Sequence, residues 1–497
     1  MTGISPPHAA GLAYRTLMES WSKEEISLLA RAKRFLEIWS VDAQLRAEFT
    51  DIARERGSFS ALAERLDLGI EIGQMAPIVL VEQAHIRQSP ELDNYPLAAL
   101  WHTYIMAMVR SLSSLFLSGQ TNGDNPDFDA WRLRQAHRLK SELGANAHGI
   151  THPTVAFELS DGCSVGCWFC GISAERFRGH WPYETNQEMW RGVLRETVDL
   201  LGPAAGTGFC YWATDPSDNP DYADFIFDFY QATGCMPQTT TAAPLKNIAL
   251  TRKVLALYDQ YRTVTNRFSI LTRKLLQRVH DTFTPEELMG VELVIQAHES
   301  LTHRSEAGRA RGQSARKQEA LIEASTIACV SGFLVNLPLG RVQAVTPTAA
   351  TDLVPLGYYV LGERFFTTAE EYGEAIRDLA AEHMRGEMRP SDMIALRPDI
   401  KVSVQDGAVV LTDRHLILTL TGDWAHHLAA ATAASPVRLS LLISQMSGSG
   451  LSVLAAVAEM GKLFAHGLFL EQGMLAPYAT PGGARIATPS PLDETVA

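Results

Sequence analysis

The chain has 497 residues, of which 46% are hydrophobic and 20% charged, and its net charge at pH 7 is −13. At about 150 residues per domain this length allows roughly three domains, and it is long enough to bury a core without disulfide or metal staples. The composition excludes collagen, coiled coil and wholesale disorder. The acidic balance argues against a general nucleic-acid binder and against a protein that binds anionic membranes.

Six cysteines are too few for a disulfide scaffold in a chain of this length. The first fifteen residues lack the basic-then-apolar order of a secretory signal, so we expect a cytoplasmic protein with free thiols. The longest uncharged stretch, 439–458, could span a bilayer by its length, but a Ser-Gly-Ser-Gly break at 447–450 favours two soluble elements. We therefore expect no membrane span.

Helical spacing of apolar residues dominates the N-terminal region, which we assign to residues 1–125. Ser22 and Glu25 form a capping box before an amphipathic run that ends near Trp39. Asp42 is the expected N-cap of a second helix that stops near Gly57. Further helices are expected over 62–66 and 97–117, the latter followed by a linker at 120–126.

After residue 151, short β-branched or aromatic runs alternate with helical stretches. The expected strands are 154–159, 208–213, 237–241, 267–271, 291–296 and 333–337, with helices such as 188–201 and 222–231 between them. This alternation predicts an α/β fold with a parallel sheet, and six strands favour a partial barrel over a closed one. We assign residues 126–397 to this region.

The C-terminal pattern changes again near residue 398. Alternating strands are expected at 401–404, 408–411 and 415–419, and helices at 423–433, 437–445 and 451–466. Three strands and three helices fit a small winged-helix-like module over 398–475. Residues 476–497 are rich in Pro, Gly, Thr and Ala and are predicted to be a disordered tail.

Three cysteines, Cys163, Cys167 and Cys170, lie within eight residues directly after the first strand of the alternating region. An α/β sheet binds its ligands at that end of a strand. Three thiolates on one short loop can bind three irons of a cubane cluster, and without a fourth cysteine the fourth iron is open to another ligand. The alternatives fit less well: His180 does not give finger-like zinc spacing, and a loop rich in Gly and Ser is not a place for three packing cysteines.

The three-then-two spacing, with Phe169 before the last cysteine, resembles the signature of radical S-adenosylmethionine (SAM) enzymes. The run 152–162, the sequence CWFCGISA and the segment 211–216 resemble one branch, the radical SAM peptide epimerases of ribosomal peptide natural-product maturation. The resemblance covers roughly residues 140–365. It implies an α/β fold with a partial (β/α)6 radical SAM barrel, one 4Fe-4S cluster on the three cysteines, SAM as cosubstrate with Phe169 in the cofactor site, and an electron donor such as flavodoxin or ferredoxin.

In this branch a 5′-deoxyadenosyl radical takes hydrogen from the Cα of an L-residue, and a cysteine thiol returns one from the opposite face. Cys329 resembles the family's donor, because it leads into the strand that begins at Phe333. On sequence chemistry alone a lone cysteine is more often a buried small hydrophobe, and only the resemblance reverses that preference. Cys210 is the second candidate, with packing as its alternative, and Cys235 has no functional argument.

The contacts to SAM are less clearly marked, because the glycine-glycine-glutamate element common in the family is not visible after the second strand. Asp215 occupies that place and is a candidate acceptor for the SAM ammonium, with a turn residue as the alternative. Thr241 and Ser269 are candidate methionyl-carboxylate or ribose contacts, with ordinary strand hydrogen bonding as the alternative. His298 and Glu299 are either polar pocket groups or a solvent-facing pair at a helix start.

The expected partner is a ribosomal precursor peptide with a leader. Binding a leader remote from the reacting residue raises the local concentration of substrate, and the C-terminal module is a candidate reader that adds the leader as a strand; a structural cap is the alternative. Two other functions remain open. One is another radical SAM peptide maturase, bond-forming or peptide-excising, and the other is a leader-binding iron-sulfur scaffold.

Overall fold

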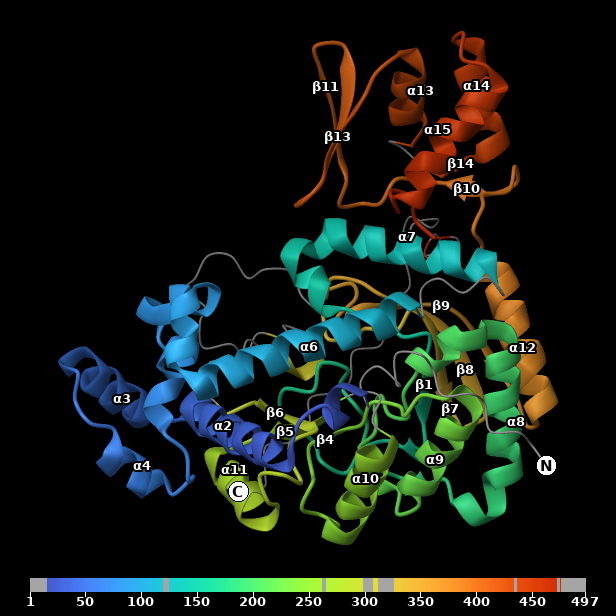
Figure 1. Ribbon diagram of the computed structural model, residues 1–497. Coiled ribbons are helices and arrows are strands. Elements are labelled where there is room, and N and C mark those ends of the chain that lie inside the picture. Colours follow the sequence, from blue (N-terminus) through green and yellow to red (C-terminus); the bar gives the residue numbers. More distant parts are fainter. Residues whose placement is uncertain are drawn as a thin grey trace.

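The computed structural model describes residues 16–118, 125–261, 265–297, 307–311, 326–432, 436–471 and 474, and helices and strands mix along this chain (Figure 1). The described strands form several small sheets and no closed barrel. The mixed α/β class expected from the sequence is therefore confirmed. The predicted tail at 476–497 lies outside the described residues, as do His298 and Glu299.

The N-terminal region is helical, as predicted. The Ser22 hydroxyl accepts a hydrogen bond from the Glu25 amide (3.1 Å), and the Glu25 carboxylate accepts one from the Ser22 amide (2.8 Å), so the capping box is present. Asp42 Oδ1 accepts from the Leu45 amide at 3.0 Å and begins the second helix. The helices are α2 (Lys23–Val41), α3 (Ala43–Glu55), α4 (Ser60–Leu66), α5 (Ala76–Val79) and α6 (Pro96–Ser118).

Two parallel sets of strands form the centre of the chain. In the first, β1 (Val155–Glu158) pairs parallel with β7 (Gly332–Asn336), and β8 (Arg341–Pro347) and β9 (Tyr358–Phe365) extend it antiparallel. In the second, β4 (Thr240–Thr241), β5 (Asn266–Ile270) and β6 (Val291–Ile295) are parallel. Phe209 makes single parallel bridges to Ala156 and Gln238, which link the two sets.

Four of the six predicted strands are confirmed to within about a residue at each end, and two are much shorter than predicted. The segment 208–213 is reduced to the bridge at Phe209, and the segment 237–241 to β4 and the bridge at Gln238. Side-chain oxygens there accept the hydrogen bonds that a neighbouring strand would otherwise accept. The Ala213 amide donates to Glu158 Oε1 at 2.9 Å, and the Thr239 amide donates to Asn266 Oδ1 at 3.2 Å. The antiparallel pair β8 and β9 was not predicted.

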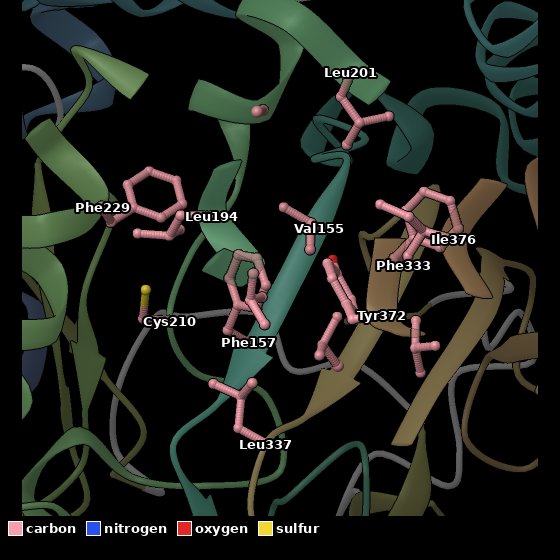
Figure 2. Close-up of a cluster of buried hydrophobic side chains, with 14 of the residues drawn as sticks. Val155, Phe157, Leu194, Leu201, Cys210, Phe229, Phe333, Leu337, Tyr372 and Ile376 are labelled. Carbon is pink, nitrogen blue, oxygen red and sulfur yellow. The ribbon is translucent and has the colours of Figure 1, made fainter. Parts of the chain in front are cut away.

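Each parallel strand set buries one face under helices. Val155 and Phe157 of β1 and Phe333 of β7 point into a core formed with α8 (Tyr183–Leu201), α9 (Tyr222–Thr233) and α12 (Ala369–His383), as Figure 2 shows. Phe268 and Ile270 of β5 pack with α11 (Arg273–Thr282), and α10 (Ile248–Tyr261) lies beside α9. The alternate residues of these strands occupy the other side, which we call the inner face.

The inner face carries its own smaller cluster. Because side chains alternate along a strand, the neighbours of the helix-facing residues point the other way. Ala156, Phe209, Trp212, Ala328, Val330, Leu334 and Val345 are buried together there.

The C-terminal module has the predicted order of strands and helices and an independent core. β11 (Lys401–Gln405), β12 (Ala408–Thr412) and β13 (Ile417–Leu420) form an antiparallel sheet, followed by α13 (Asp423–Thr432), α14 (Leu439–Gly448) and α15 (Val453–Ala465). Val409, Leu411, Leu428, Leu442 and Met460 are buried between them. Within the part of the chain that the structure describes, no helix combines the length and apolarity needed to cross a membrane.

Helix α7 (Pro126–Leu143) lies between this module and the rest of the chain (Figure 1). Arg134 donates to Glu471 (Nε to Oε1, 2.9 Å), and its guanidinium lies 3.7 Å from the ring centroid of Phe464 on α15. Arg138 reaches the other way and donates to Thr346 Oγ1 of β8 at 3.0 Å. These guanidinium groups are almost fully buried, so an ion pair to the module and hydrogen bonds to the sheet, rather than apolar contacts alone, connect the two through α7.

Replacing Arg134 by Met is expected to destabilise the protein by about 3 to 5 kcal/mol, because it leaves the Glu471 carboxylate buried without its cation. Equilibrium urea unfolding followed by tryptophan fluorescence measures this. The control is Arg54→Met, which removes an exposed ion pair with Asp51 at 3.5 Å and is expected to change stability by less than about 0.5 kcal/mol. Equal midpoints for the two variants would contradict the anchoring role of Arg134.

Candidate functional site

The three clustered cysteines lie on a loop between β2 (Ser160–Asp161) and β3 (Gly179–His180), which pair antiparallel just beyond β1. The Cys163 amide donates to the Glu175 carbonyl (2.9 Å), and the Cys163 carbonyl accepts from the Phe177 amide (3.2 Å). All three cysteines are half-buried. The loop is therefore closed at its base and presents its thiols at the carboxyl end of β1.

Burial and neighbouring charges act on two of the thiols, Cys163 and Cys167. Burial raises the pKa of Cys163 to about 11. Burial, together with the charges of Cys163 and Cys170, raises the pKa of Cys167 to about 12. Backbone amides already point at sulfur: the Ala174 amide donates to Cys170 Sγ at 3.3 Å. A bound cationic group is what ionises such thiols, because a thiolate is the form that ligates metal.

The donor set of the loop consists of three thiols, and thiolates are the usual ligands of iron-sulfur clusters. Within the described ranges, no three or more His, Cys, Asp or Glu side chains are arranged to hold one metal ion. In a cubane each thiolate binds a different iron, so the sulfurs stand apart around the cluster, and N–H donors to sulfur tune it. The loop supplies three thiols and one backbone donor to Cys170 Sγ, which is the chemistry that such a cluster needs.

Two segments pack directly against the cysteine loop. A Cβ on Gly171 would lie 2.5 Å from the side chain of Ile327, and a Cβ on Gly308, which has φ +54°, would lie 2.4 Å from the Gly171 carbonyl oxygen. The Arg309 amide donates to the Cys170 carbonyl at 2.9 Å. The glycines therefore permit a close approach that side chains would block, and Ile327 is only two residues before Cys329.

Cys329 lies on the inner face. It packs, with Tyr211 and Ile172, against the inner-face cluster. Burial raises the pKa of Cys329 to about 12, while the charge of Arg267 lowers it. Burial also raises the pKa of Tyr211 to about 12, and Cys329 adds to that rise. Cys329, Tyr211 and Arg267 therefore share one side of the strands, next to the cysteine loop.

The other two cysteines have a different environment. Cys210 is 1% exposed in the helix-facing core, where Figure 2 shows it on the side of Phe229. Cys235 is fully buried in the same core. The packing interpretation of Cys210 thus matches its surroundings.

Asp215 and Thr241 lie in contact. Asp215 accepts hydrogen bonds from the Thr241 hydroxyl and the Ala242 amide, both at 2.8 Å, and from the Ser217 amide at 2.9 Å. Burial raises the pKa of the Asp215 carboxyl, although these hydrogen-bond donors lower it in part. The turn role of Asp215 is present in the structure, and its role as a SAM contact stays a prediction.

Ser269 and Phe169 are not part of that contact. Thr241 pairs with Phe268 and shares its side of the sheet, whereas Ser269 shares the opposite side with Arg267. Ser269 is half-buried on the inner face. The Phe169 ring lies edge-on to Trp168, with centroids 5.4 Å apart. Binding of SAM by either residue stays a prediction.

Sequence reasoning missed the carboxylates that hold the loops of the site. Glu158, at the end of β1, accepts from the Ala213 amide (2.9 Å) and from Asn336 Nδ2 (2.7 Å), and burial raises its pKa. A glutamate in an otherwise apolar strand was the available signal. Asp218 binds Ser164 on the cysteine loop and Lys246 beyond β4, and no local pattern marks these residues.

His152 supports the segment that carries Cys329. Its Nδ1 lies 2.7 Å from the Ser331 hydroxyl, and its backbone adopts φ +51°. Burial, together with the positive charges of Arg132 and Arg138, lowers the pKa of His152 to about 3. The imidazole is therefore neutral in the folded protein at pH 7.

Comparison with known proteins places the chain beside one relative. No protein-family model matches it, and no solved structure matches it. It is 40% identical over 472 residues to y4wI of Sinorhizobium fredii, described as an uncharacterized protein, and the match covers 93% of this chain and 91% of y4wI. That description names no activity.

Neutral His152 makes stability depend on pH. The unfolded chain binds a proton at His152 below about pH 6.5, whereas the folded chain binds it only near pH 3. Neutral His152 therefore contributes to the free energy of unfolding above pH 6.5, and this contribution is lost as the pH falls. Between pH 8 and pH 5.5 it amounts to about 1.4 kcal/mol. Urea unfolding at both values is expected to show a smaller loss in His152→Asn, since asparagine tolerates the left-handed backbone and does not titrate. Equal losses in the two proteins would refute this role.

Proposed function

Starting from the premise that the chain belongs to the same family as y4wI of Sinorhizobium fredii, we propose that it is a radical SAM peptide epimerase. Its substrate is a ribosomally made precursor peptide, in which it converts selected L-residues to D-residues. The observation that carries the proposal is the contact between the cysteine loop and the Cys329 segment, made through Gly171 and Ile327. A ligand-binding loop and a free thiol on the same inner face are what the reaction requires.

The finer fold we propose is a partial (β/α)6 barrel. The parallel segments follow the order β7, β1, Phe209, Gln238 with β4, β5 and β6, joined by the two single bridges. Helices cover the outer face of this array, and the inner face keeps a mixture of apolar and polar side chains. Ligand sites lie at the carboxyl ends of strands in such arrays, which is where the cysteine loop follows β1.

Cys163, Cys167 and Cys170 would hold one 4Fe-4S cluster. When bound, such a cluster supplies the electron that cleaves SAM and thereby the radical that removes a hydrogen from Cα. The chain's own contribution is to position the peptide and return a hydrogen. Cys329 suits the second task, because burial keeps its thiol protonated at neutral pH. Donation of the hydrogen atom would leave a thiyl radical, which one electron from the external donor and one proton from solvent would return to the thiol.

Polar side chains on the inner face suit an extended peptide. Tyr211 Oη accepts from the Thr240 hydroxyl at 2.8 Å and donates to Gln238 Oε1 at 3.2 Å. Arg267 pairs with Glu292 at 2.8 Å, and both side chains keep about half their exposure, 46% and 55%. Binding pockets combine apolar walls with a few such directed polar groups, and these groups lie on the same side as Cys329.

We assign leader recognition to the winged-helix-like module. In the described part of the chain β11 pairs only with β12, so its other edge offers unpaired backbone groups. Val402 and Val404 on β11 are 39% and 60% exposed beside the buried Val409 and Leu411. A cavity of about 790 Å³ at the base of this strand is lined by residues from the module and from the loop after β8. Lys401 of β11 is one of the residues that line this cavity, so a peptide added to the β11 edge would begin beside it.

The reaction is tested with anaerobically reconstituted protein, reductant, SAM and a candidate precursor peptide, in deuterated water. Wild type is expected to give 5′-deoxyadenosine and deuterium at Cα. In Cys329→Ala, deuterium at Cα is expected to fall to background while 5′-deoxyadenosine still forms. The matched control Cys210→Ala should keep both products.

Other products would point to other functions. Crosslinking or excision of the peptide, unaffected by Cys329→Ala, would identify a different radical SAM maturase. A cluster spectrum that does not respond to SAM would favour a leader-binding scaffold. Loss of epimerisation in Cys210→Ala alone would move the donor to Cys210.

Leader binding is tested by Val404→Asp, which places a charge on the apolar border of the β11 edge. The dissociation constant of a fluorescent leader peptide is expected to rise about tenfold, equivalent to about 1.4 kcal/mol. Fluorescence anisotropy measures it. Ile417→Asp on β13, where Ile417 is 78% exposed, is the control and should leave binding unchanged. A larger rise in the dissociation constant for Ile417→Asp than for Val404→Asp would indicate that the peptide binds at the β13 edge instead.

A further inference from the structure

An ion pair between Asp218 and Lys246, which lie on two other loops, contacts the cysteine loop at Ser164, the residue after Cys163. Asp218 Oδ2 accepts a hydrogen bond from the Ser164 amide at 2.8 Å, and Asp218 Oδ1 binds both the Ser164 hydroxyl and the Lys246 ammonium. Lys246 Nζ also donates to Ser164 Oγ at 2.9 Å. Ser164 therefore contacts both charged groups of the pair.

The two charges are unequally exposed. The Asp218 side chain is 0% exposed, whereas Lys246 keeps 44% of its exposure. A buried carboxylate without a cation is costly, so Lys246 offsets a charge that water cannot reach. The negative charge of Asp218 lies close to the cluster-binding loop, since its carboxylate accepts from the backbone amide of the residue that follows Cys163.

The ion pair belongs to a larger circuit of hydrogen bonds. The Asp218 amide donates to the Asp215 carbonyl at 2.9 Å, and the Lys246 amide donates to the Ala243 carbonyl at 3.0 Å. Asp215 and Thr241 close the circuit through their own hydrogen bond. The loops after β1, after Phe209 and after β4 are thus fixed relative to one another by three side chains, Asp215, Asp218 and Lys246.

We propose that Asp218 and Lys246 are positioning residues that hold the cysteine loop and set the reduction potential of the cluster it binds. This inference rests on the proposed function, because it requires an iron-sulfur cluster on the loop. A fixed negative charge disfavours the reduced, more negative state of a cluster, and a positive charge favours it. Asp218 thus lowers the potential and Lys246 raises it, and both contact the Ser164 hydroxyl.

Removing the two opposite charges is expected to shift the midpoint potential of the cluster in opposite directions. A merely structural role of the two residues does not predict this difference in sign. In Asp218→Asn the amide oxygen still accepts from Ser164, and the midpoint potential is expected to rise. In Lys246→Gln the chain keeps a hydrogen-bonding group of similar reach, and the potential is expected to fall. The double variant Asp218→Asn/Lys246→Gln should lie between the two single variants.

The measurement is an anaerobic redox titration of the reconstituted full chain, followed by electron paramagnetic resonance, with iron content determined for each protein. Lys253→Gln is the matched control, because Lys253 pairs with Asp224 at 2.8 Å on the exposed surfaces of α10 and α9. Its potential should equal that of wild type. Shifts of the same sign in Asp218→Asn and Lys246→Gln, or no shift in either, would overturn the inference.

A second measurement covers variants that do not take up a cluster. In cluster-free protein, hydrogen exchange across 163–170 is expected to be faster in Asp218→Asn and Lys246→Gln than in Lys253→Gln, because the grip on Ser164 is weakened. Equal exchange in all three would refute the positioning role. If wild type itself binds no iron, the proposed function fails, and this outcome is distinct from normal iron content with unshifted potentials.

Discussion

The structure depends on the burial of both faces of β1. Val155 and Phe157 enter the helix-facing core, and Ala156 enters the inner-face cluster, so all three are fully buried. Its parallel neighbours, β7 and the bridge at Phe209, satisfy the backbone on both edges. A strand closed on four sides leaves only its ends for ligands. The cysteine loop emerges at the carboxyl end.

Carboxylates accept hydrogen bonds from backbone amides that strand pairing leaves without a partner at that end of β1. Glu158, Asp215 and Asp218 are all buried, and each accepts hydrogen bonds from at least one backbone amide of a neighbouring loop. Buried charges are tolerated only where such donors surround them. The loops around the cysteines therefore take their positions from side-chain hydrogen bonds more than from strand pairing, which is why they carry short strands and many turns.

What could be predicted from the sequence was local in origin. The capping box at Ser22 and the cysteine spacing from Cys163 to Cys170 depend on residues close in the chain, and both segments lie where they were expected, in a helix start and a loop after β1. The loss of most of the strand at 208–213 has a distant cause, because Glu158 lies fifty-five positions from Ala213. Lys246 donates a hydrogen bond to Ser164, which lies eighty-two positions away in the sequence, and no local pattern near either residue predicts this contact.

The same reasoning separates the two candidate hydrogen donors. Phe209 is buried in the inner-face cluster, and Cys210, one residue later, is buried in the helix-facing core. A shift of one residue exchanges the two faces of an extended segment. For Cys210 to reach the inner face, Phe209 would have to enter the core beside Phe157 and Phe229, where packing leaves no room for it. Cys329 needs no such rearrangement, since it already lies on the inner face beside the cysteine loop, with Tyr211 and Arg267 close to its thiol.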